Sequence, residues 1–234
     1  MSETERLERI DAIGVVGRVA PEHKVLMVET LRKKGDVVAM TGDGVNDAPA
    51  IKAADIGIAM GSGTQVAKNA GRMILTDDNF ATIVRAVSEG RKLYDNMLKY
   101  IRFMLVALVT YVVTFLMASV LNIAGGQPFS ATQVLWINFV ITAPVGIALG
   151  LDKETPGLMK RMPRPRTASI MSPAVITTVG LVGLFMAVSI NAVIVFGEKE
   201  YGEGAIPASM GLVAFSLMLI IAAFESRDEK AAIL

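Results

Sequence analysis

The stretch MTGDGVNDAPAIKAADIGIAM, Met40 to Met60, decides how the first part of this chain folds. An apolar run ends at Thr41-Gly42-Asp43-Gly44, a short helical pattern follows, and a second apolar run occupies residues 54–60. Strands that alternate with helices predict a parallel α/β sheet. Asp43 then stands at the carboxyl edge of that sheet, where α/β proteins bind their ligands.

The flanking residues extend the same alternation. Strands are predicted at 13–19, 36–42, 54–60 and 71–75, with helices at 21–35, 46–54 and 64–69. Proline in the first turn and glycine after the last turn mark the ends of the first of these helices.

The residue types in the quoted stretch suit a phosphate and a metal ion. Gly42 and Gly44 leave space for a phosphate, and Asn46 opens a helix whose first amides favour anions. Asp43 and Asp47 would repel that phosphate unless a cation such as Mg²⁺ lay between them. Lys24 can supply a further positive charge. The competing interpretation is a capped turn that carries surface acids.

The bulk composition points to a membrane protein. Of the 234 residues, 53% are hydrophobic, the mean hydropathy is +0.51, and the formal net charge is +1. This charge gives no reason to expect a nucleic-acid partner. The absence of cysteine excludes disulfides and thiolate metal sites, and the polar N-terminus does not resemble a signal peptide.

The apolar residues gather after residue 102. A helical period from Asn79 predicts one helix over about 80–122, roughly 60 Å long at about 1.5 Å per residue. Uncharged runs predict four membrane spans, and a large soluble helical core is the weaker alternative. The spans are about 103–121, 130–151, 173–196 and 208–224. Five basic residues lie in the connector after the second span: Lys153, Lys160, Arg161, Arg164 and Arg166. By the positive-inside rule this connector and both termini are expected in the cytoplasm.

Several motifs resemble those of P-type ATPases, the phosphorylated cation pumps of the haloacid-dehalogenase superfamily, and in particular the type II, calcium-pump-like members. They are TGDGVNDAPAIKAADIGIAMG (41–61), RVAPEHK (18–24), the stalk-like 77–103, VLWINFV (134–140), GLMKRMPRPR (157–166) and FESRDEKAAIL (224–234). The resemblance implies that Asp43 binds Mg²⁺, that Asn46 and Asp47 organise the site, and that Lys24 contacts phosphate. It also places Thr41, Gly42 and Gly44 beside the cofactor, gives Asp55 a role in the fold, and makes His23 part of an exposed turn.

The resemblance also sets the expected domain organisation. Residues 1–78 are expected to be the carboxyl-terminal half of a phosphorylation domain with a partial haloacid-dehalogenase-like parallel sheet, 79–102 a helical stalk, and 103–234 an all-α membrane domain. The DKTGT motif that carries the phosphorylated aspartate in this family does not occur in these residues. We therefore expect a carboxyl-terminal part of an ATP-driven cation pump that is inactive alone and needs the amino-terminal half as its partner. The alternatives are a complementing or regulatory membrane subunit and a membrane-anchored phosphatase.

The expected transport site departs from that of calcium pumps. None of the four predicted spans contains Asp or Glu, although intramembrane acids usually mark ion pathways. Asn138 and Thr142 are the candidate contacts for a transported cation, beside Pro144, which can free backbone carbonyls. The competing interpretation is that such polar groups only hold helices together. The transported ion cannot be identified from these residues.

Overall fold

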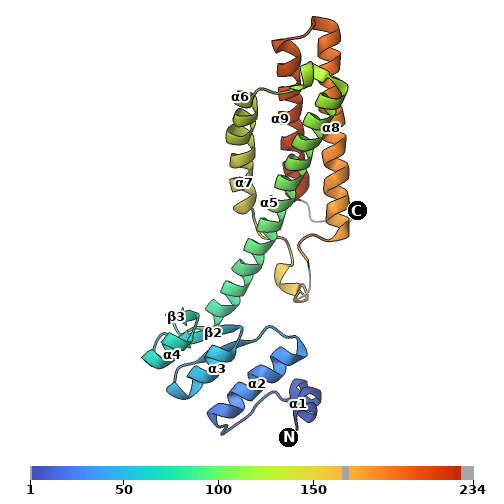
Figure 1. Ribbon diagram of the computed structural model, residues 1–234. Coiled ribbons are helices and arrows are strands. Elements are labelled where there is room, and N and C mark those ends of the chain that lie inside the picture. The colour runs from blue at the N-terminus through green and yellow to red at the C-terminus, as the bar shows by residue number, and fades with distance from the viewer. Residues whose placement is uncertain (1, 165–168, 228–234) are drawn as a thin grey trace. The chain divides into compact units, whose positions relative to one another are not determined.

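A computed structural model describes residues 2–164 and 169–227. Arg166 and residues 228–234, which contributed to the sequence interpretation, lie outside the described residues. Contacts between residues divide the chain into two units, one running to Glu89 and the other taking most of the chain from Gly90 onward. Figure 1 labels the elements of both.

The first unit is built on a three-stranded parallel sheet in the order β1-β2-β3. Its strands are β1 (Ala39–Gly42), β2 (Ile56–Met60) and β3 (Met73–Leu75). The helices are α1 (Glu3–Arg9), the 3-10 turn η1 (Ile10–Ala12), α2 (Pro21–Lys34), the 3-10 turn η2 (Val45–Asp47), α3 (Ala48–Ala53) and α4 (Gln65–Ala70). Each crossover between strands contains a helix, as parallel pairing requires.

Apolar side chains from the helices and the strands form the core of this unit. Val28 of α2 packs with Val38, Ala50 and Ala54, and a second cluster joins Ile51, Ala59 and Ala67. At Gly57 a Cβ would lie 2.3 Å from the carbonyl oxygen of Ile51, so only glycine lets α3 approach β2 this closely. Asp55 accepts a hydrogen bond from the Val38 amide (3.0 Å) and pairs with Arg32, which fits its expected role in the fold.

One predicted strand is wrong. Residues 13–19 form no strand, and the Val15 side chain is 93% exposed. The run IGVVGRV has the unalternating pattern of a buried strand, but within the described sheet it has no hydrogen-bonded neighbour. Without that pairing its residues connect η1 to α2 as an irregular segment, with Arg18 in the left-handed region at φ 51°.

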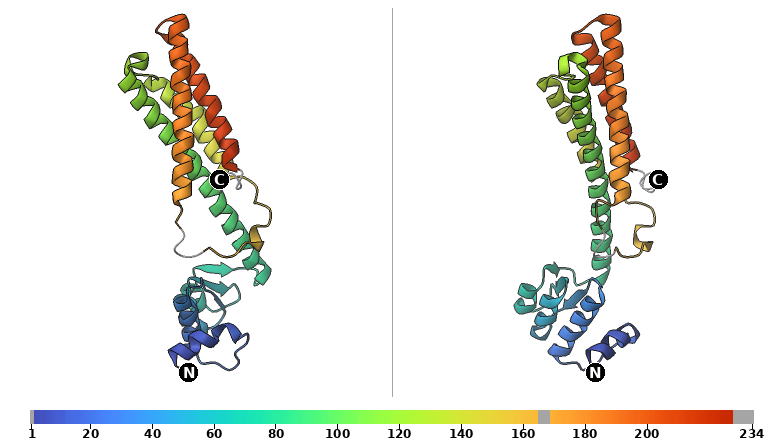
Figure 2. Two further views of the ribbon diagram at one scale, coloured as in Figure 1. Left: turned by 90° about the vertical axis from the view of Figure 1, so that its right-hand side faces the viewer. Right: turned by 45° about the vertical axis from the view of Figure 1, so that its right-hand side comes forward.

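The second unit consists of long apolar helices (Figures 1 and 2). They are α5 (Phe80–Leu121), α6 (Ala131–Trp136), the π-helix η4 (Ile137–Thr142), α7 (Ala143–Gly150), α8 (Pro173–Tyr201) and α9 (Ala205–Arg227). Two short 3-10 turns, η3 (Ile123–Gly126) and η5 (Leu158–Lys160), lie in the connections. The predicted helix over 80–122 is confirmed as one 42-residue helix, whose amino-terminal end belongs to the first unit.

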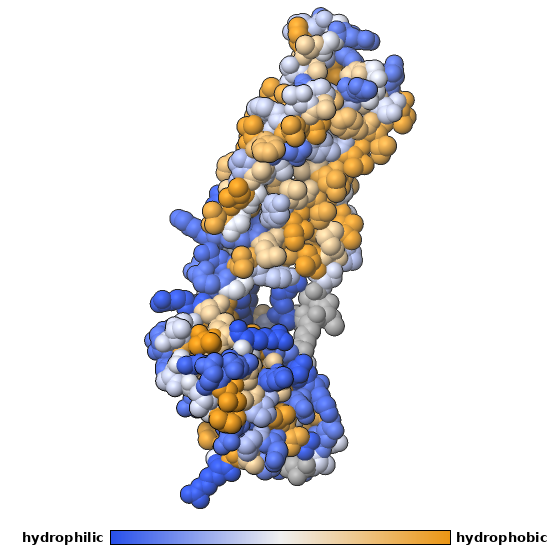
Figure 3. All heavy atoms as spheres, turned by 60° about the vertical axis from the view of Figure 1, so that its left-hand side comes forward, coloured by the Kyte–Doolittle hydropathy of each residue, from blue (hydrophilic) through white to orange (hydrophobic). Residues whose placement is uncertain are grey.

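Four helical stretches are long and apolar enough to cross a membrane: Phe80–Leu121, Ala131–Gly150, Pro173–Tyr201 and Ala205–Arg227. Their buried faces share one core that includes Phe103, Ile137, Ile190 and Phe215. Figure 3 shows apolar side chains gathered over the outer surface of this unit. Exposed apolar side chains of this extent suit contact with lipid or with further apolar protein rather than with water.

The turns at one end of the helices contact each other. The amide of Ala124 in η3 donates a 2.8 Å hydrogen bond to Glu198, near the end of α8. The connection between α5 and α6 therefore lies beside the connection between α8 and α9. Both connections therefore lie at the same end of the helices.

Candidate phosphate and magnesium site of the first unit

The candidate site lies where the three parallel strands end. Asp43 follows the last residue of β1 directly, and it is exposed. Asn46 is also exposed, whereas Asp47 in η2 is buried, with 8% of its surface exposed. Thr41 and Gly42, the last residues of β1, are half-buried beneath them. Asp43 and Asn46 therefore face solvent while Asp47 lies within the protein.

A short ion pair joins α2 to this edge. Lys24 Nζ lies 2.5 Å from Asp47 Oδ1, and the other carboxylate oxygen accepts a 3.2 Å hydrogen bond from the Gly44 amide. Burial opposes ionisation of Asp47, but the hydrogen bonds from Lys24 and Gly44 outweigh it and lower the pKa of this carboxyl. The pair therefore fixes the ammonium group of Lys24, a residue of α2, at the edge of the sheet.

The two glycines of the TGDG segment have different structural roles. A Cβ added to Gly42 would lie 2.4 Å from Cβ of Asp47, so any side chain there would displace the carboxylate. A Cβ on Gly44 would meet Asp47 Oδ2 only at 3.5 Å, an ordinary contact. Gly42 is thus needed for the position of Asp47, and Gly44 is needed for its backbone amide.

A loop after β2 supports Asp43, and sequence reasoning did not identify it. The Thr64 amide donates a 2.8 Å hydrogen bond to the carbonyl of Asp43, and Gly63 packs directly on the Asp43 backbone. Asp78, in the left-handed region at φ 50°, accepts hydrogen bonds from the amides of Gly61 (2.6 Å) and Ser62. These bonds, with that from the Ser62 side chain the strongest, lower the pKa of Asp78. The Asp77-Asp78 pair after a strand was the available signal.

This edge suits Mg²⁺ held jointly with a phosphate. Within the described residues no group of three or more His, Cys, Asp or Glu side chains could enclose a metal ion. Mg²⁺ does not need such a cage, because it keeps several waters and is commonly bound by one or two carboxylates plus substrate phosphate. Exposed Asp43, beside the Lys24 charge, fits that mode of binding.

The candidate ion contacts of the membrane unit lie around η4. Asn138 is exposed, and its amide donates to the Val134 carbonyl of its own helix at 3.0 Å. Thr142 is buried, and its hydroxyl donates to the Ile137 carbonyl at 3.4 Å. Pro144 has no amide hydrogen to continue the ladder. The helix around these residues is therefore irregular, and its own residues 130–151 include no Asp or Glu.

Known proteins resemble this chain along its whole length. The family described as haloacid dehalogenase-like hydrolase matches residues 5–55, and the family described as "Cation transporting ATPase, C-terminus" matches residues 126–234. "Calcium-transporting ATPase lmo0841" of Listeria monocytogenes is 46% identical over 193 residues, 81% of this chain and 22% of the relative. "Calcium-transporting ATPase 1" of Lactococcus lactis is 38% identical over 234 residues, all of this chain and 26% of the relative.

The chain belongs to the P-type cation-transporting ATPases.

It spans about a fifth to a quarter of the length of these ATPase relatives. "Calcium-transporting ATPase 1" of Bacillus cereus is 46% identical over 75% of this chain, and the match covers 20% of that relative. A solved structure of the catalytic domain of the CPx-ATPase CopB-B covers 37% of this chain and 35% of its own, with 34% identity and a TM-score of 0.30. With four apolar helices in addition, the chain is a multi-pass membrane member of the P-type ATPase family.

A second polar cluster in this P-type ATPase chain was not predicted from its sequence. Asp152, just beyond α7, accepts hydrogen bonds from Lys99 of α5 (3.0 Å) and from Arg227 of α9 (2.9 Å). The Asn96 amide donates to the carbonyls of Gly150 (3.2 Å) and Asp152 (2.8 Å), which are left open at the end of α7. We call these four side chains, Asn96, Lys99, Asp152 and Arg227, the helix-end cluster.

Lys99 and Asp152, at the centre of the helix-end cluster, are largely shielded from water. The Lys99 side chain is 5% exposed and that of Asp152 is 11% exposed. Burial raises the pKa of Asp152, but the hydrogen bonds from Arg227 and Lys99 dominate and lower it to about 2. One carboxylate thus joins the carboxyl-terminal ends of α7 and α9 to the middle of α5 in the ATPase chain.

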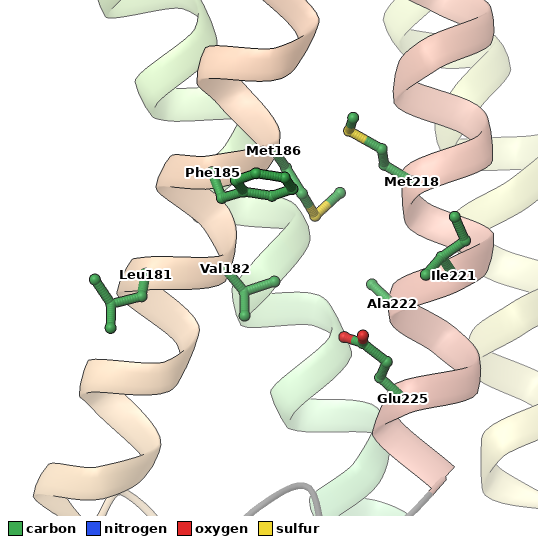
Figure 4. Close-up of a pocket in the computed structure, with 8 residues that line it drawn as sticks. All are labelled: Leu181, Val182, Phe185, Met186, Met218, Ile221, Ala222 and Glu225. Atoms are coloured by element: carbon green, nitrogen blue, oxygen red, sulfur yellow. The ribbon is translucent and has the colours of Figure 1, made fainter. Parts of the chain in front are cut away.

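An apolar groove lies between α8 and α9 of the same unit (Figure 4). Its volume is about 380 Å³, and its walls include Phe185 and Met186 from α8 and Met218 from α9. Glu225 is the acidic residue of its lining, and its carboxylate points from α9 toward α8. Glu225 lies close to the end of α9, so the groove brings no carboxylate to the middle of the helices.

Proposed function

We propose that this chain supplies the magnesium-binding part of the phosphorylation domain, and four membrane helices, to a pump that couples ATP hydrolysis to cation transport. The pair Lys24–Asp47 beside exposed Asp43 carries this proposal. In family members of this kind the phosphoryl group passes through an aspartyl-phosphate. The 234 residues contain no DKTG motif, so we assign them the binding and positioning of the group and not its acceptance.

Each residue of the site has a distinct task in this proposal. Asp43 holds Mg²⁺, which neutralises charge on the phosphoryl group when it is bound. Lys24 contributes a positive charge to the same group, and Asp47 keeps that lysine in place through the 2.5 Å pair. Asn46, Thr41, Gly42 and Gly44 shape the space that the phosphate enters. Positioning and charge neutralisation are the main requirements of phosphoryl transfer.

The four helices then form part of the ion pathway. The relatives are named calcium-transporting ATPases, so calcium is the first cation to test. Against calcium stands the absence of Asp and Glu from the uncharged cores of all four helices, because a calcium site takes six to eight oxygens and usually includes carboxylates. Asn138 and Thr142, both within the π-helix η4, are the proposed cation contacts.

The topology follows from the basic connector. Lys153, Lys160, Arg161 and Arg164 lie between α7 and α8, and by the positive-inside rule this basic charge supports a cytoplasmic position for the connector and for both chain termini in a cell-membrane protein. The first unit then lies on the side of the membrane that contains ATP. The connections at 122–130 and 202–204 face the opposite side.

The test of the site measures phosphoenzyme formation and turnover by the complete pump. Asp43→Asn removes the charge that we assign to Mg²⁺ binding, and losses of comparable electrostatic groups reduce turnover by roughly a hundredfold to a thousandfold. Glu22→Gln is the matched control, because Glu22 is an exposed acid in the first turn of α2. Equal turnover of the two variants over a range of Mg²⁺ concentrations would remove Asp43 from the site.

A further inference from the structure

The close contact between α5 and α8 is independent of the proposed phosphoryl chemistry. Phe103, Ala107, Thr110, Thr114 and Ala118 of α5 are buried at intervals of three or four residues. On α8, a Cβ added to Gly183 would lie 2.6 Å from Val109 Cγ1 and 3.4 Å from the Thr110 amide. The two helices therefore approach closely in an apolar setting, where every polar atom needs a partner.

Thr110 has such a partner. Its hydroxyl donates a 2.8 Å hydrogen bond to the Val106 carbonyl of the preceding turn. Thr114 occupies the equivalent place one turn later and is equally buried, with 0% of its surface exposed, as for Thr110. Its hydroxyl oxygen nevertheless has no hydrogen-bond partner among the described residues.

Asn191 of α8 has a matching unpaired atom. Its amide nitrogen donates to the Ala187 carbonyl (2.9 Å) and to the Thr114 carbonyl (3.4 Å). Both partners are acceptors, so the orientation of the amide is fixed and its oxygen is the atom left over. This oxygen is fully buried and has no partner in the described part of the chain, and Asn191 is only 2% exposed.

Two unpaired oxygens on residues already in contact point to a bound ligand. A buried polar group left without a partner costs about 1–3 kcal/mol, and buried water commonly supplies the missing bonds. The two atoms complement the two roles of water, since the Thr114 hydroxyl can donate and the Asn191 oxygen can accept. A divalent cation is a poor fit, because both residues are neutral and no carboxylate lies in these helix cores.

We propose that the contact between α5 and α8 binds one ordered water molecule, which accepts a hydrogen bond from Thr114 Oγ1 and donates one to Asn191 Oδ1. The water joins the two helices within the membrane-spanning core. Tyr111 also has an unpaired hydroxyl, but its ring packs against Phe215 of α9, with centroids 4.5 Å apart, and it is not part of this site.

The sign of a stability change tests the proposal. Thr114→Val keeps the shape of the side chain and removes only the hydroxyl. If water is bound, the full chain in detergent should lose roughly 2–4 °C in midpoint temperature, the expected size for one net hydrogen bond in a chain of this length. Thr110→Val is the matched control, since it removes an equally buried hydroxyl whose partners, the Val106 carbonyl and Met186 Sδ of α8 (3.7 Å), are both protein atoms. A rise in midpoint for Thr114→Val relative to the control would mean a dry site and overturn the proposal.

A high-resolution structure of the full chain provides the second measurement and does not depend on the variants. Density is expected within about 3 Å of both oxygens, and it should be unchanged when Na⁺ is replaced by K⁺ or by choline. Absence of that density would overturn the proposal. An anomalous signal at the same place with Tl⁺ would overturn it too, because the ligand would then be a monovalent cation.

Discussion

Asp152→Asn should destabilise the membrane unit at neutral pH by removing the negative charge that Lys99 and Arg227 share. The pKa of Asp152 is lowered from its ordinary value of 3.8 to about 2. At about 1.4 kcal/mol for each pKa unit, this lowering corresponds to about 2 kcal/mol of unfolding free energy. Lys99 should dominate the effect, because its side chain is 5% exposed whereas that of Arg227 is 52% exposed and screened by water.

The dependence on pH gives this prediction its sign. A carboxyl whose pKa is lowered in the folded state stabilises that state above its unfolded value, near 4, and the contribution disappears as pH falls toward 2. The wild type and Asp152→Asn should therefore differ at pH 7 and converge at the acid end of the range.

The assay is denaturant-driven unfolding of the full chain in mixed micelles, followed by helix content at pH 7 and at lower pH. Glu154→Gln is the matched control, because it neutralises an exposed acid two residues further along the same connector. If Asp152→Asn unfolds at the same denaturant concentration as Glu154→Gln at pH 7, the helix-end cluster contributes nothing measurable, and the reasoning from burial and hydrogen bonding is refuted.

Three further predictions follow from the first unit and from the connections. Gly42→Ala should displace Asp47 and lower the unfolding free energy of the first unit by more than about 1 kcal/mol. Gly44→Ala, whose Cβ would have ordinary room, should lower it less, so equal melting temperatures of the two variants would contradict the contact at 2.4 Å. Asp43→Asn should abolish Mg²⁺-dependent phosphoenzyme formation by the complete pump while leaving the thermal stability of the chain near that of Glu22→Gln, since Asp43 is exposed. Single cysteines at Gln127 and Glu203 should react with an impermeant thiol reagent from outside the cell, and one at Met162 should react only after permeabilisation; the reverse pattern would invert the proposed topology.

The sequence was sufficient to predict an element wherever a local residue pattern determines that element. The helix predicted over 21–35 is α2, Pro21–Lys34, and the uncharged runs became the cores of the four long helices. Strands at 36–42, 54–60 and 71–75 were predicted too long but in the right places, because apolar runs do not show where hydrogen bonding stops. The segment 13–19 failed for the related reason that an apolar run does not show whether a partner strand exists.

The proximity of the candidate site residues could be predicted where they are close in the chain. Asp43, Asn46 and Asp47 fall within one short motif, and Lys24 within a second. The helix-end cluster joins residues 53 and 75 positions apart, and a single sequence contains no signal of such a pairing. The exposed position of Asn138 also could not be foreseen, because it depends on which helix faces pack in three dimensions.

The π-helix η4 has a consequence for how this gene can change its length. The buried residues of this stretch follow two series, Ile137 and Ile141 before the extra residue, then Thr142, Gly146 and Leu149 after it. A π-turn contains one residue more than an α-helical turn, so it shifts the phase of everything that follows. Deleting one codon for exposed Phe139 or Val140 would bring Ile137, Thr142, Gly146 and Leu149 onto a single α-helical stripe. A one-residue deletion, which would rotate the buried face out of a regular helix, can therefore be accommodated here during evolution without unpacking the bundle.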